Sequence, residues 1–514
     1  MAATVAANRH NHKIQFSTIL VGQLGKDSVG GSAGDAGSVG RRIDQLLRGQ
    51  IADGTLAPGA RLPSTRALAA DLGVSRTTVT AVFEQLSAEG FIVTAAGRAA
   101  RVASQLQPAA AGRRTARAPR PAPPLSAFGQ RLQHMGLSAL PDGEPCRVDF
   151  LYGALAWRDF PARLWRRAHQ AALLQHQPSL YYAPPEGEAT LRQALQGYLR
   201  RARGLHCEAA QILVVHGSQQ AIDLCARLLL DAGDRFAFEE PGYLMARRCF
   251  EATGAHPLAV PVDAQGLDTA HLPEDPATRL VYVTPSHQFP LGGMLSMARR
   301  QELLRWAARQ RAWIIEDDYD GEFRYGQRPI DALQSIDVEG RVIYVGTFSK
   351  ALSPQLRLGY LVLPPELVPV FRKAKRLNDR HAPVLEQRTL ATLIASGAYE
   401  RHVRRMRREH ERRRSALLQA IAAQLPAAAR VAGTAAGLHV VLWLPWLKPR
   451  DEPALVAAAR ARGVGVHALS PLFHDPASRG RPRQAGLMLG YAGLTPEQIL
   501  QGVQALAAAL ADLA

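Results

Sequence analysis

The sequence predicts an α/β protein of two domains, a small helical one at the N-terminus and a large one with a mostly parallel sheet. Three observations predict this. The chain has 514 residues, more than a single hydrophobic core usually organises. A segment rich in Pro, Ala and Arg interrupts it at residues 105–147. After that segment strand-like and helix-like runs alternate, which is typical of a parallel sheet covered by helices.

The composition is that of a globular protein with a basic surplus. Hydrophobic residues make up 47% and charged residues 21%, which excludes a disordered chain. The net charge of +18 favours a polyanionic partner, because cations that neutralise phosphates release counterions. The four cysteines have no metal-binding or disulfide spacing, which suits a reducing compartment. Because we find neither a secretion signal nor an apolar run of about 18 residues, we expect a cytoplasmic protein without a membrane partner.

Composition divides the chain into four segments. Residues 1–37 are mostly small and polar, which predicts a disordered leader. Residues 38–104 read as a compact domain and 105–147 as a partly polyproline-II linker. Residues 148–514 contain the alternating strands and helices of the large domain.

The small domain has the pattern of a winged helix-turn-helix. After a first helix that ends before Gly54, Ser64 is expected to cap a second helix that stops at Gly73, and Ser75 to cap a third. Two short helices joined at a glycine, the second with an exposed polar start, form a unit that enters the major groove. A two-stranded wing is expected around residues 97–98. The third helix is expected to bury Val79, Val82, Phe83 and Leu86.

The stretch LPSTRALAADLGVSRTTVTAVFEQLSAEGFI resembles the GntR family of winged-helix repressors. The resemblance implies that the PSxR arginine, the start of the recognition helix and the wing tip contact double-stranded operator DNA. An ordinary three-helix packing unit is the alternative interpretation. The candidate DNA-binding residues are Ser64, Arg66, Ser75, Arg76, Thr77, Thr78, Thr80, Gly97 and Arg98.

A lysine with unusual surroundings follows a strand-like run in the large domain. In YVGTFSKALSPQLRLGY the strand ends near Gly346 and Lys350 follows in a small polar loop. Lysine condenses with an aldehyde when its environment lowers its pKa. Thr347 and Ser349 offer hydroxyls beside it, and Arg357 a bidentate fork for a phosphate.

Three further motifs could supply groups that bind a cofactor beside that lysine. The run AWIIEDDYDGEFRY places carboxylates at the carboxyl end of a strand, where they could hold a pyridinium nitrogen or, alternatively, a divalent metal. The turn in VVHGSQQAIDL could cradle a phosphate with backbone amides. The turn in EEPGYLMARR presents Tyr243, which could stack on an aromatic ring.

Together these motifs resemble fold-type I pyridoxal-phosphate enzymes, over residues 149–514. With SLYYAPPEGEATLRQAL and TPSHQFPLGG they resemble the MocR/GabR subfamily, whose members join a GntR-type domain to an aminotransferase-like domain. The resemblance implies pyridoxal 5'-phosphate as cofactor, an amino-group effector and a homodimer, because such sites are built across a subunit interface.

The resemblance also implies roles for individual residues. Lys350 would carry the cofactor as a Schiff base, Asp317 would pair with the pyridine nitrogen, Tyr319 would bond the 3-hydroxyl and Tyr243 would stack on the ring. The phosphate would be held by Gly217, Ser218, Gln219, Thr347, Ser349 and Arg357, with Tyr182 from a partner subunit.

Two departures from catalytic aminotransferases bear on turnover. The chain reads FPLG at 289–292 where those enzymes commonly read NPTG, with an Asn that bonds the ring oxygen. It has Leu487 and Met488 where many have an Arg that clamps the substrate carboxylate, a contact that orients the reacting bond. The residues that could bind the carboxylate in place of that arginine are Arg462, Arg479, Arg481, Arg483 and His467.

These observations predict a regulator that senses an amino-group metabolite, or pyridoxal phosphate itself, through Lys350. A working aminotransferase with an attached DNA-binding domain is the alternative, and a repressor that has lost its cofactor is a third possibility. The arginine-rich run RHVRRMRREHERRRSALL is either a solvated helix face or a basic track for DNA.

Overall fold

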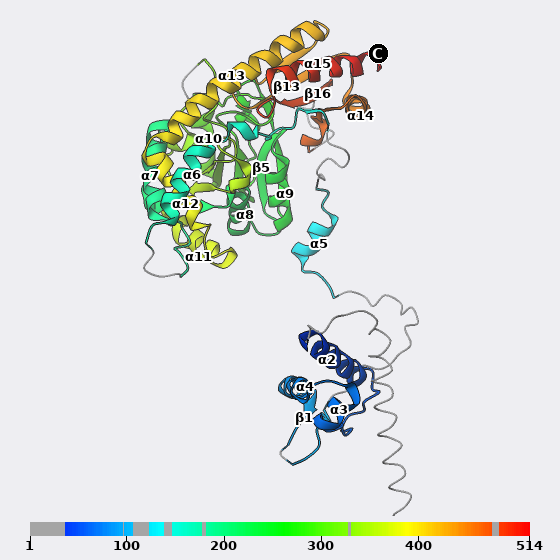
Figure 1. Cartoon of the computed structure of the whole chain (residues 1–514). Coiled ribbons are helices and arrows are strands. Elements are labelled where there is room, and N and C mark those ends of the chain that lie inside the picture. Colours follow the sequence, from blue (N-terminus) through cyan, green and yellow to red (C-terminus); the bar gives the residue numbers. More distant parts are fainter. Residues whose placement is uncertain are drawn as a thin grey trace, which may run out of the picture. The chain divides into compact units, whose positions relative to one another are not determined.

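The computed structural model describes residues 36–95, 97–105, 123–137, 146–176, 181–326, 330–474 and 483–513. The chain divides into two compact units, residues 1–123 and 124–514, whose helices and strands are labelled in Figure 1. Of the expected leader, residues 1–35 lie outside the described residues, and the first described helix begins at Ala36. No helix in these ranges is long and apolar enough to cross a membrane.

The small unit has the expected helix-turn-helix and wing. Ser64 accepts from the amide of Ala67, and Ser75 from that of Thr78, each cap contributing about 1 kcal/mol. Gly73 ends the second helix in the left-handed region, at φ 65°, which glycine adopts without strain. Val79, Val82, Phe83 and Leu86 are buried as expected. The elements are α2 (Ala36–Ala52), α3 (Thr65–Leu72), α4 (Arg76–Ala88) and the antiparallel pair β1 (Ile92–Val93) and β2 (Arg101–Val102).

Part of the expected linker is a helix that packs on the large unit. Helix α5 (Ala127–His134) is capped by Ser126, and its Arg131 donates to the carbonyls of Ala252 and Thr253 at 2.8 and 2.9 Å. Those carbonyls end helix α9 (Leu244–Thr253) and have no partner within that helix. The large unit therefore extends into residues 105–147, of which 106–122 and 138–145 lie outside the described residues.

The large unit is built on an eight-stranded sheet of order β4-β11-β10-β9-β8-β5-β6-β7. Strands β10, β9, β8, β5 and β6 are mutually parallel, and β11 runs antiparallel to β10 and β4. The strands expected before Lys350 and in the run AWIIEDDY are confirmed as β10 and β9. The strands are β4 (Ile212–Val215), β5 (Arg235–Glu240), β6 (His256–Asp263), β7 (Gly266–Leu267), β8 (Thr278–Val283), β9 (Trp313–Asp318), β10 (Val342–Thr347) and β11 (Gly359–Val362).

Helices cover both faces of this sheet. Residues of α8, α9 and α11 pack on Ile343 and Val345 of β10, whereas α7 and α12 pack around Tyr344. Side chains alternate between the faces of a strand, so the helices form two separate layers, as expected for an α/β domain. The helices are α6 (Ala162–Leu173), α7 (Ala189–Arg203), α8 (Gly217–Leu229), α10 (Met297–Gln310), α11 (Val368–Asn378), α12 (Val384–Ala395) and α13 (Ala398–Gln424).

The C-terminal part forms a smaller α+β layer. Strand β16 lies between β13 and β15 in a four-stranded antiparallel sheet of order β12-β13-β16-β15, and β14 pairs in parallel with β3. The elements are β3 (Val148–Asp149), β12 (Arg430–Ala432), β13 (His439–Leu444), α14 (Glu452–Ala461), β14 (Val464–Gly465), β15 (His467–Ala468), β16 (Ala485–Gly490) and α15 (Pro496–Ala511).

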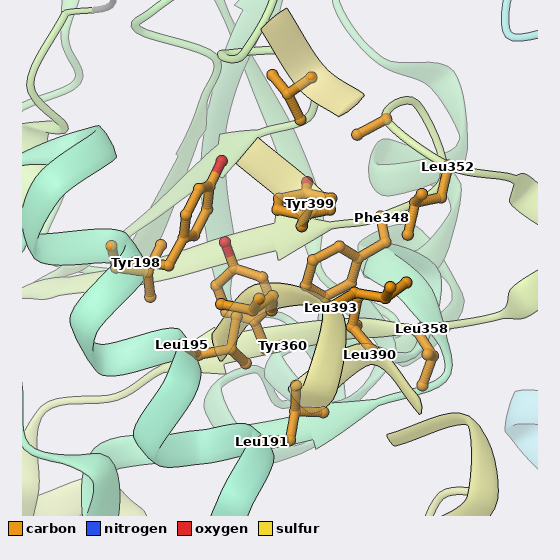
Figure 2. Close-up of a cluster of buried hydrophobic side chains, with 14 of the residues drawn as sticks. Leu191, Leu195, Tyr198, Phe348, Leu352, Leu358, Tyr360, Leu390, Leu393 and Tyr399 are labelled. Carbon is orange, nitrogen blue, oxygen red and sulfur yellow. The ribbon is translucent and has the colours of Figure 1, made fainter. Parts of the chain in front are cut away.

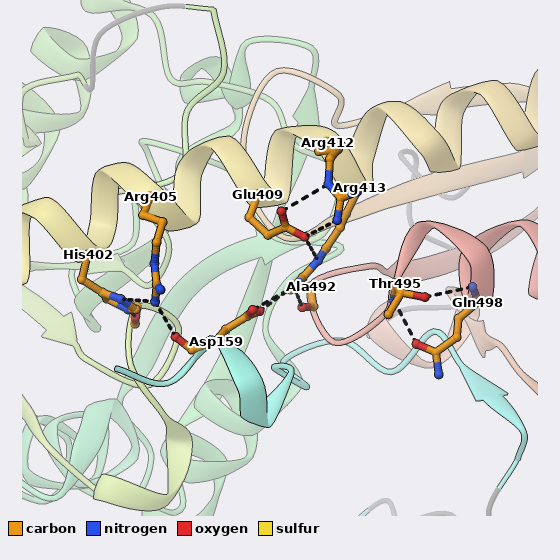
Figure 3. Close-up of polar contacts among 10 residues, drawn as sticks. Asp159, His402, Arg405, Glu409, Arg412, Arg413, Ala492, Thr495 and Gln498 are labelled. Atoms are coloured by element: carbon orange, nitrogen blue, oxygen red, sulfur yellow. Dashed lines mark hydrogen bonds and ion pairs between the residues drawn. The ribbon is translucent and has the colours of Figure 1, made fainter. Parts of the chain in front are cut away.

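The arginine-rich run lies in helix α13, and several of its arginines form hydrogen bonds or ion pairs with other parts of the large unit (Figure 3). The side chain of Arg413 is 3% exposed and donates to the carboxylate of Asp159 at 2.7 Å and to the carbonyl of Ala492. Arg405 donates to the Asp159 carbonyl, and Arg407 to the Glu322 carbonyl. The interpretation of this run as a solvated helix face is therefore wrong for Arg413, whose side chain is buried, whereas Arg405 is exposed and agrees with it. The Asp159 carboxylate and the Ala492 carbonyl need the donors that Arg413 supplies.

Candidate cofactor site and DNA-binding surface

The candidate site lies where adjacent parallel strands end. Asp317 of β9 is paired in register with Val345 of β10, and Lys350 follows three residues after β10 ends. Figure 2 shows Phe348 and Leu352, on either side of the lysine, inserted into a buried apolar cluster, where they are 2% and 4% exposed. These two anchors hold the loop at the carboxyl edge of the sheet, the usual ligand site of an open α/β sheet.

Asp317 has one oxygen satisfied and one without a partner. The hydroxyl of Tyr282 donates to its Oδ2 at 2.5 Å, whereas its buried Oδ1 has no hydrogen-bond partner among the described residues. Burial raises the pKa of Asp317 to about 7. Leaving a buried acceptor unpaired is costly, and a protonated pyridine nitrogen would satisfy it. The residue therefore fits the ring of pyridoxal phosphate.

Lys350 lies in a desolvated aromatic environment. Its Nζ is 4.2 Å from the ring centroid of Tyr152. Burial lowers the pKa of Lys350 to about 8, although the charges of Asp320 and Asp317 oppose this. Gly153, at φ +87°, has a conformation that favours glycine, and a Cβ there would lie 2.7 Å from Nζ. The ammonium is thus poised to lose a proton and react as a free amine.

The predicted phosphate residues gather at the start of α8. Gly217 begins this helix at φ +76°, and a Cβ on it would lie 3.2 Å from Nη1 of Arg357. The other nitrogen of that guanidinium, Nη2, donates to the His216 carbonyl at 2.7 Å. Gly359 is paired in register with both Val215 and Thr347, which brings the loops after β4 and β10 together. Helix amides and an arginine in one place suit a phosphate dianion.

The aromatic residues of the site form one cluster. Tyr243 precedes α9 and its ring centroid is 5.7 Å from that of Phe289; burial raises the pKa of Tyr243 to about 12. Phe289, Tyr319 and Met488 are buried together. The two departures from catalytic aminotransferases, Phe289 and Met488, therefore belong to the same buried apolar cluster as Tyr319.

The carboxylates at the end of β9 and just after it contact separate partners. Glu316 accepts from the amides of Leu333 and Gln334 at 2.7 and 2.9 Å. Asp318 forms an ion pair with Arg203 at 2.6 Å. Asp320 lies 2.9 Å from Nδ1 of His287. This divergence gives no support to the alternative of a shared divalent cation.

Tyr182 and the substitutes for the carboxylate clamp have other contacts. The ring of Tyr182 lies under the Arg380 guanidinium at 4.6 Å and the residue is 58% exposed. Arg462 pairs with Asp512 at 2.5 Å, and His467 with Asp149 at 3.0 Å. Arg483 is exposed at the start of the last described segment, and Arg479 and Arg481 lie outside the described residues.

Sequence reasoning missed several residues of the site, chiefly Tyr152, Tyr282 and His287, and gave Asp320 only the alternative role of a metal ligand. His287 lies four residues after the end of β8, and Asp317 is the second-to-last residue of β9. The position of the run TPSHQF after a strand's carboxyl end was therefore an available signal. Tyr152 has no such signal, since it follows a two-residue strand, β3.

The candidate DNA-binding residues of the small unit differ in how exposed they are. Arg66, Arg76, Thr77 and Arg98 are exposed, whereas Thr78 and Thr80 are half-buried. Ser64 and Ser75 act as helix caps, and Ser75 Oγ also lies 2.7 Å from the Thr77 and Thr78 hydroxyls. The arginines therefore offer the reach and charge for phosphate or guanine contacts.

Fold and site define the class of protein: a winged helix-turn-helix joined to a domain of aminotransferase fold. Residues 154–506 match the family model "Aminotransferase class I and II", and 40–102 match "Bacterial regulatory proteins, gntR family". The chain belongs to the MocR/GabR subfamily of GntR-family transcriptional regulators.

Relatives along the whole chain agree with this assignment. The probable rhizopine catabolism regulatory protein MocR of Rhizobium meliloti is 36% identical over 92% of this chain and 94% of its own. The pyridoxine biosynthesis transcriptional regulator PdxR of Corynebacterium glutamicum is 33% identical over 84% and 88%. Among solved structures, the α-aminoadipate aminotransferase LysN of Thermus thermophilus, complexed with N-(5'-phosphopyridoxyl)-L-leucine, has a TM-score of 0.64 and 30% identity, covering 71% of this chain and 92% of LysN.

Proposed function

We propose that this regulator binds pyridoxal 5'-phosphate on Lys350. Its affinity for operator DNA would change when an amino-group metabolite, or pyridoxal phosphate itself, binds at that site. The unpartnered Oδ1 of Asp317 carries the proposal, because it lies beside a lysine whose pKa is lowered to about 8. When bound, the cofactor would supply an aldehyde that exchanges amines and a ring that reports the exchange in its colour.

The residues divide the work of holding the cofactor. Lys350 would attach it, and Asp317 would keep the pyridine nitrogen protonated. Tyr243 would cover one face of the ring and Tyr319 would bond its 3-hydroxyl. The phosphate would be held by Gly217, Ser218, Gln219, Thr347, Ser349 and Arg357.

The assembly would be a cytoplasmic homodimer. Tyr182 is exposed, and its described ring contacts are with Tyr181, Arg380 and His381, so its hydroxyl would be available to the phosphate of a partner subunit. A dimer would also present two recognition helices to two operator half-sites. DNA contact would come from Ser64, Arg66, Ser75, Arg76, Thr77, Thr78, Thr80, Gly97 and Arg98.

The alternative function is turnover as an aminotransferase, which the similarity to LysN favours. Phe289 and Met488 argue against efficient turnover, because their buried apolar side chains offer neither an amide for the ring oxygen nor a cation for a carboxylate. Regulation is supported by the relatives MocR and PdxR, which are named as regulatory proteins. The name of PdxR, a pyridoxine biosynthesis regulator, supports a pyridoxine-related effector.

Absorbance of the purified, cofactor-loaded chain tests the proposal. We expect a visible band that Lys350→Ala abolishes and that Lys373→Ala, on the exposed side of α11, leaves intact. Titration with candidate amines should then change the band and, with the same concentration dependence, the affinity for operator DNA. No band, or a band insensitive to Lys350→Ala, contradicts cofactor binding; steady transamination of several amino donors at ordinary enzyme rates supports the alternative.

A further inference from the structure

His287 and Asp320 form a buried pair behind Tyr319. Nδ1 of His287 lies 2.8 Å from the Tyr319 hydroxyl and 2.9 Å from Oδ2 of Asp320. The three residues are 7%, 3% and 2% exposed for Tyr319, His287 and Asp320. A Cβ on Gly437, which has φ +84°, would lie 2.1 Å from Cε1 of His287. The backbone of the C-terminal layer therefore presses directly on the imidazole and fixes its position.

One nitrogen facing two oxygens determines the direction of the hydrogen bonds. An ionised carboxylate only accepts hydrogen bonds, so Asp320 places the proton of His287 on Nδ1. That N–H is then shared between Asp320 and the oxygen of Tyr319, which acts as an acceptor. The hydroxyl proton of Tyr319 is left free to point away from His287. The Nε2 of His287 is buried and has no partner among the described residues.

The groups around this pair keep Tyr319 a donor. Burial raises the pKa of Tyr319 well above its ordinary value, and the charges of Asp320, Tyr152, Asp317 and Glu239 add to the effect. On the other side, His439 packs 5.6 Å from the His287 ring, and burial lowers the pKa of His439 to about 3. The neighbouring cations are Lys350, above the Tyr152 ring, and Arg203, which donates to the hydroxyl of Ser286 beside His287. Tyr319 therefore keeps its proton across the ordinary pH range.

The asparagine amide that commonly bonds the ring oxygen is absent, since Phe289 stands in its place. We propose that His287 and Asp320 are positioning residues that direct the Tyr319 proton at the 3-oxygen of the cofactor. The hydrogen bond from Tyr319 would then take the place of the one that the asparagine amide commonly donates. This inference rests on the proposed function, namely on cofactor binding at Lys350. It assigns a use to two buried polar residues that the cofactor itself would not touch.

The pH midpoint of the visible absorbance of the cofactor-loaded chain tests the inference. In the cofactor-loaded chain, a hydrogen bond donated to the ring oxygen would stabilise the negative charge of that oxygen. It would thereby lower the pH at which the visible absorbance changes, so loss of the hydrogen bond should raise the pH midpoint. We expect Tyr319→Phe and His287→Gln each to raise it by about one pH unit. Glutamine places its amide near the Nε2 position, whereas asparagine places it at Nδ1, so His287→Asn should keep the wild-type midpoint.

A double variant separates positioning from general disturbance. On a Tyr319→Phe background, His287→Gln should add no further shift, because both changes remove the same hydrogen bond. An unchanged midpoint in His287→Gln, or a shift of full size on the Tyr319→Phe background, overturns the inference while the cofactor assignment stands. Absence of a visible band in the unmodified chain overturns the cofactor assignment and this inference with it. Far-UV circular dichroism of both amide variants checks that they fold alike.

Discussion

The hydroxyl of Tyr282 on β8 donates to Oδ2 of Asp317 on β9 at 2.5 Å, and Oδ1 of the same carboxylate is buried without a partner among the residues described. The two strands are parallel, with Tyr282 in register with Ile315, so the longer tyrosine reaches the aspartate two residues on. One oxygen is therefore held by the protein and the other is presented to the site.

This relationship predicts the effect of Tyr282→Phe. The hydrogen bond from Tyr282 lowers the pKa of Asp317, so its loss moves that pKa further above about 7 and weakens the pairing with a pyridinium. We expect roughly tenfold weaker binding of pyridoxal phosphate, since a hydrogen bond to a charged group contributes about 1.5 kcal/mol or more. Fluorescence or absorbance titration measures it. Tyr344→Phe is the matched control, because Tyr344 donates to Asp318; equal losses in both variants would contradict the prediction.

The lowered pKa of Lys350 predicts how attachment depends on pH. With a pKa of about 8, about a tenth of the amines are unprotonated at pH 7, far more than for an ordinary lysine. Rapid-mixing absorbance should therefore show an attachment rate that rises about tenfold per pH unit and levels off above about pH 8. A rate that keeps rising beyond about pH 9 would be inconsistent with this environment.

The same shift affects the stability of the cofactor-free chain. Between about 8 and the ordinary lysine value of 10.5, the unfolded chain binds a proton that the folded chain has released. The free energy of unfolding of the cofactor-free chain therefore increases as pH rises through this window. Urea unfolding of wild type and Lys350→Met should show the pH-dependent difference, and parallel profiles for the two proteins would refute it.

Removal of a recognition-helix arginine should weaken DNA binding. Arg76 is exposed at the first position of α4, and we expect Arg76→Ala to cost about 1–3 kcal/mol of operator affinity if it reads a base. If it contacts a phosphate, the loss will instead be uniform across sequences, with a smaller salt dependence. Fluorescence anisotropy at several salt concentrations distinguishes the two. Arg41→Ala on α2 removes the same charge and should change affinity little.

Arginines of α13 should differ sharply in their contribution to stability. Arg413→Met leaves the Asp159 carboxylate and the Ala492 carbonyl without their donor, and breaking such a buried pair costs about 3–5 kcal/mol. Arg408→Met on the exposed face of the same helix should shift stability by about 0.5 kcal/mol or less. The midpoints of urea unfolding compare them, and similar midpoints would show that Arg413 does not fasten the fold.

Helix α9 joins the cofactor site to the end of the linker, since Tyr243 precedes it and Arg131 caps its last carbonyls. We expect Arg131→Met to release α5, with faster amide hydrogen exchange over residues 127–134 and unchanged cofactor affinity. Unaltered exchange in that helix would show that Arg131 does not hold it. Arg305→Met, on the exposed face of α10, serves as the control.

Sequence patterns along the chain predicted the local elements well. Ser64 and Ser75 cap helices as expected, and the apolar runs around Asp317 and before Lys350 became β9 and β10. Caps and hydrophobic periodicity report interactions between residues a few positions apart. They therefore indicated the helix-turn-helix, the parallel sheet and the loop that carries Lys350.

By itself, then, the sequence determined the two domains, their element types and the positions of Lys350, Asp317 and Arg357 at strand ends or loops. Only the tertiary structure decided that His287 meets Tyr319 and Asp320, that Arg413 is buried and that α5 belongs to the large unit. Each of these depends on which strands and helices become neighbours. Such contacts join residues far apart in the chain, and their partners are set by packing rather than by local pattern.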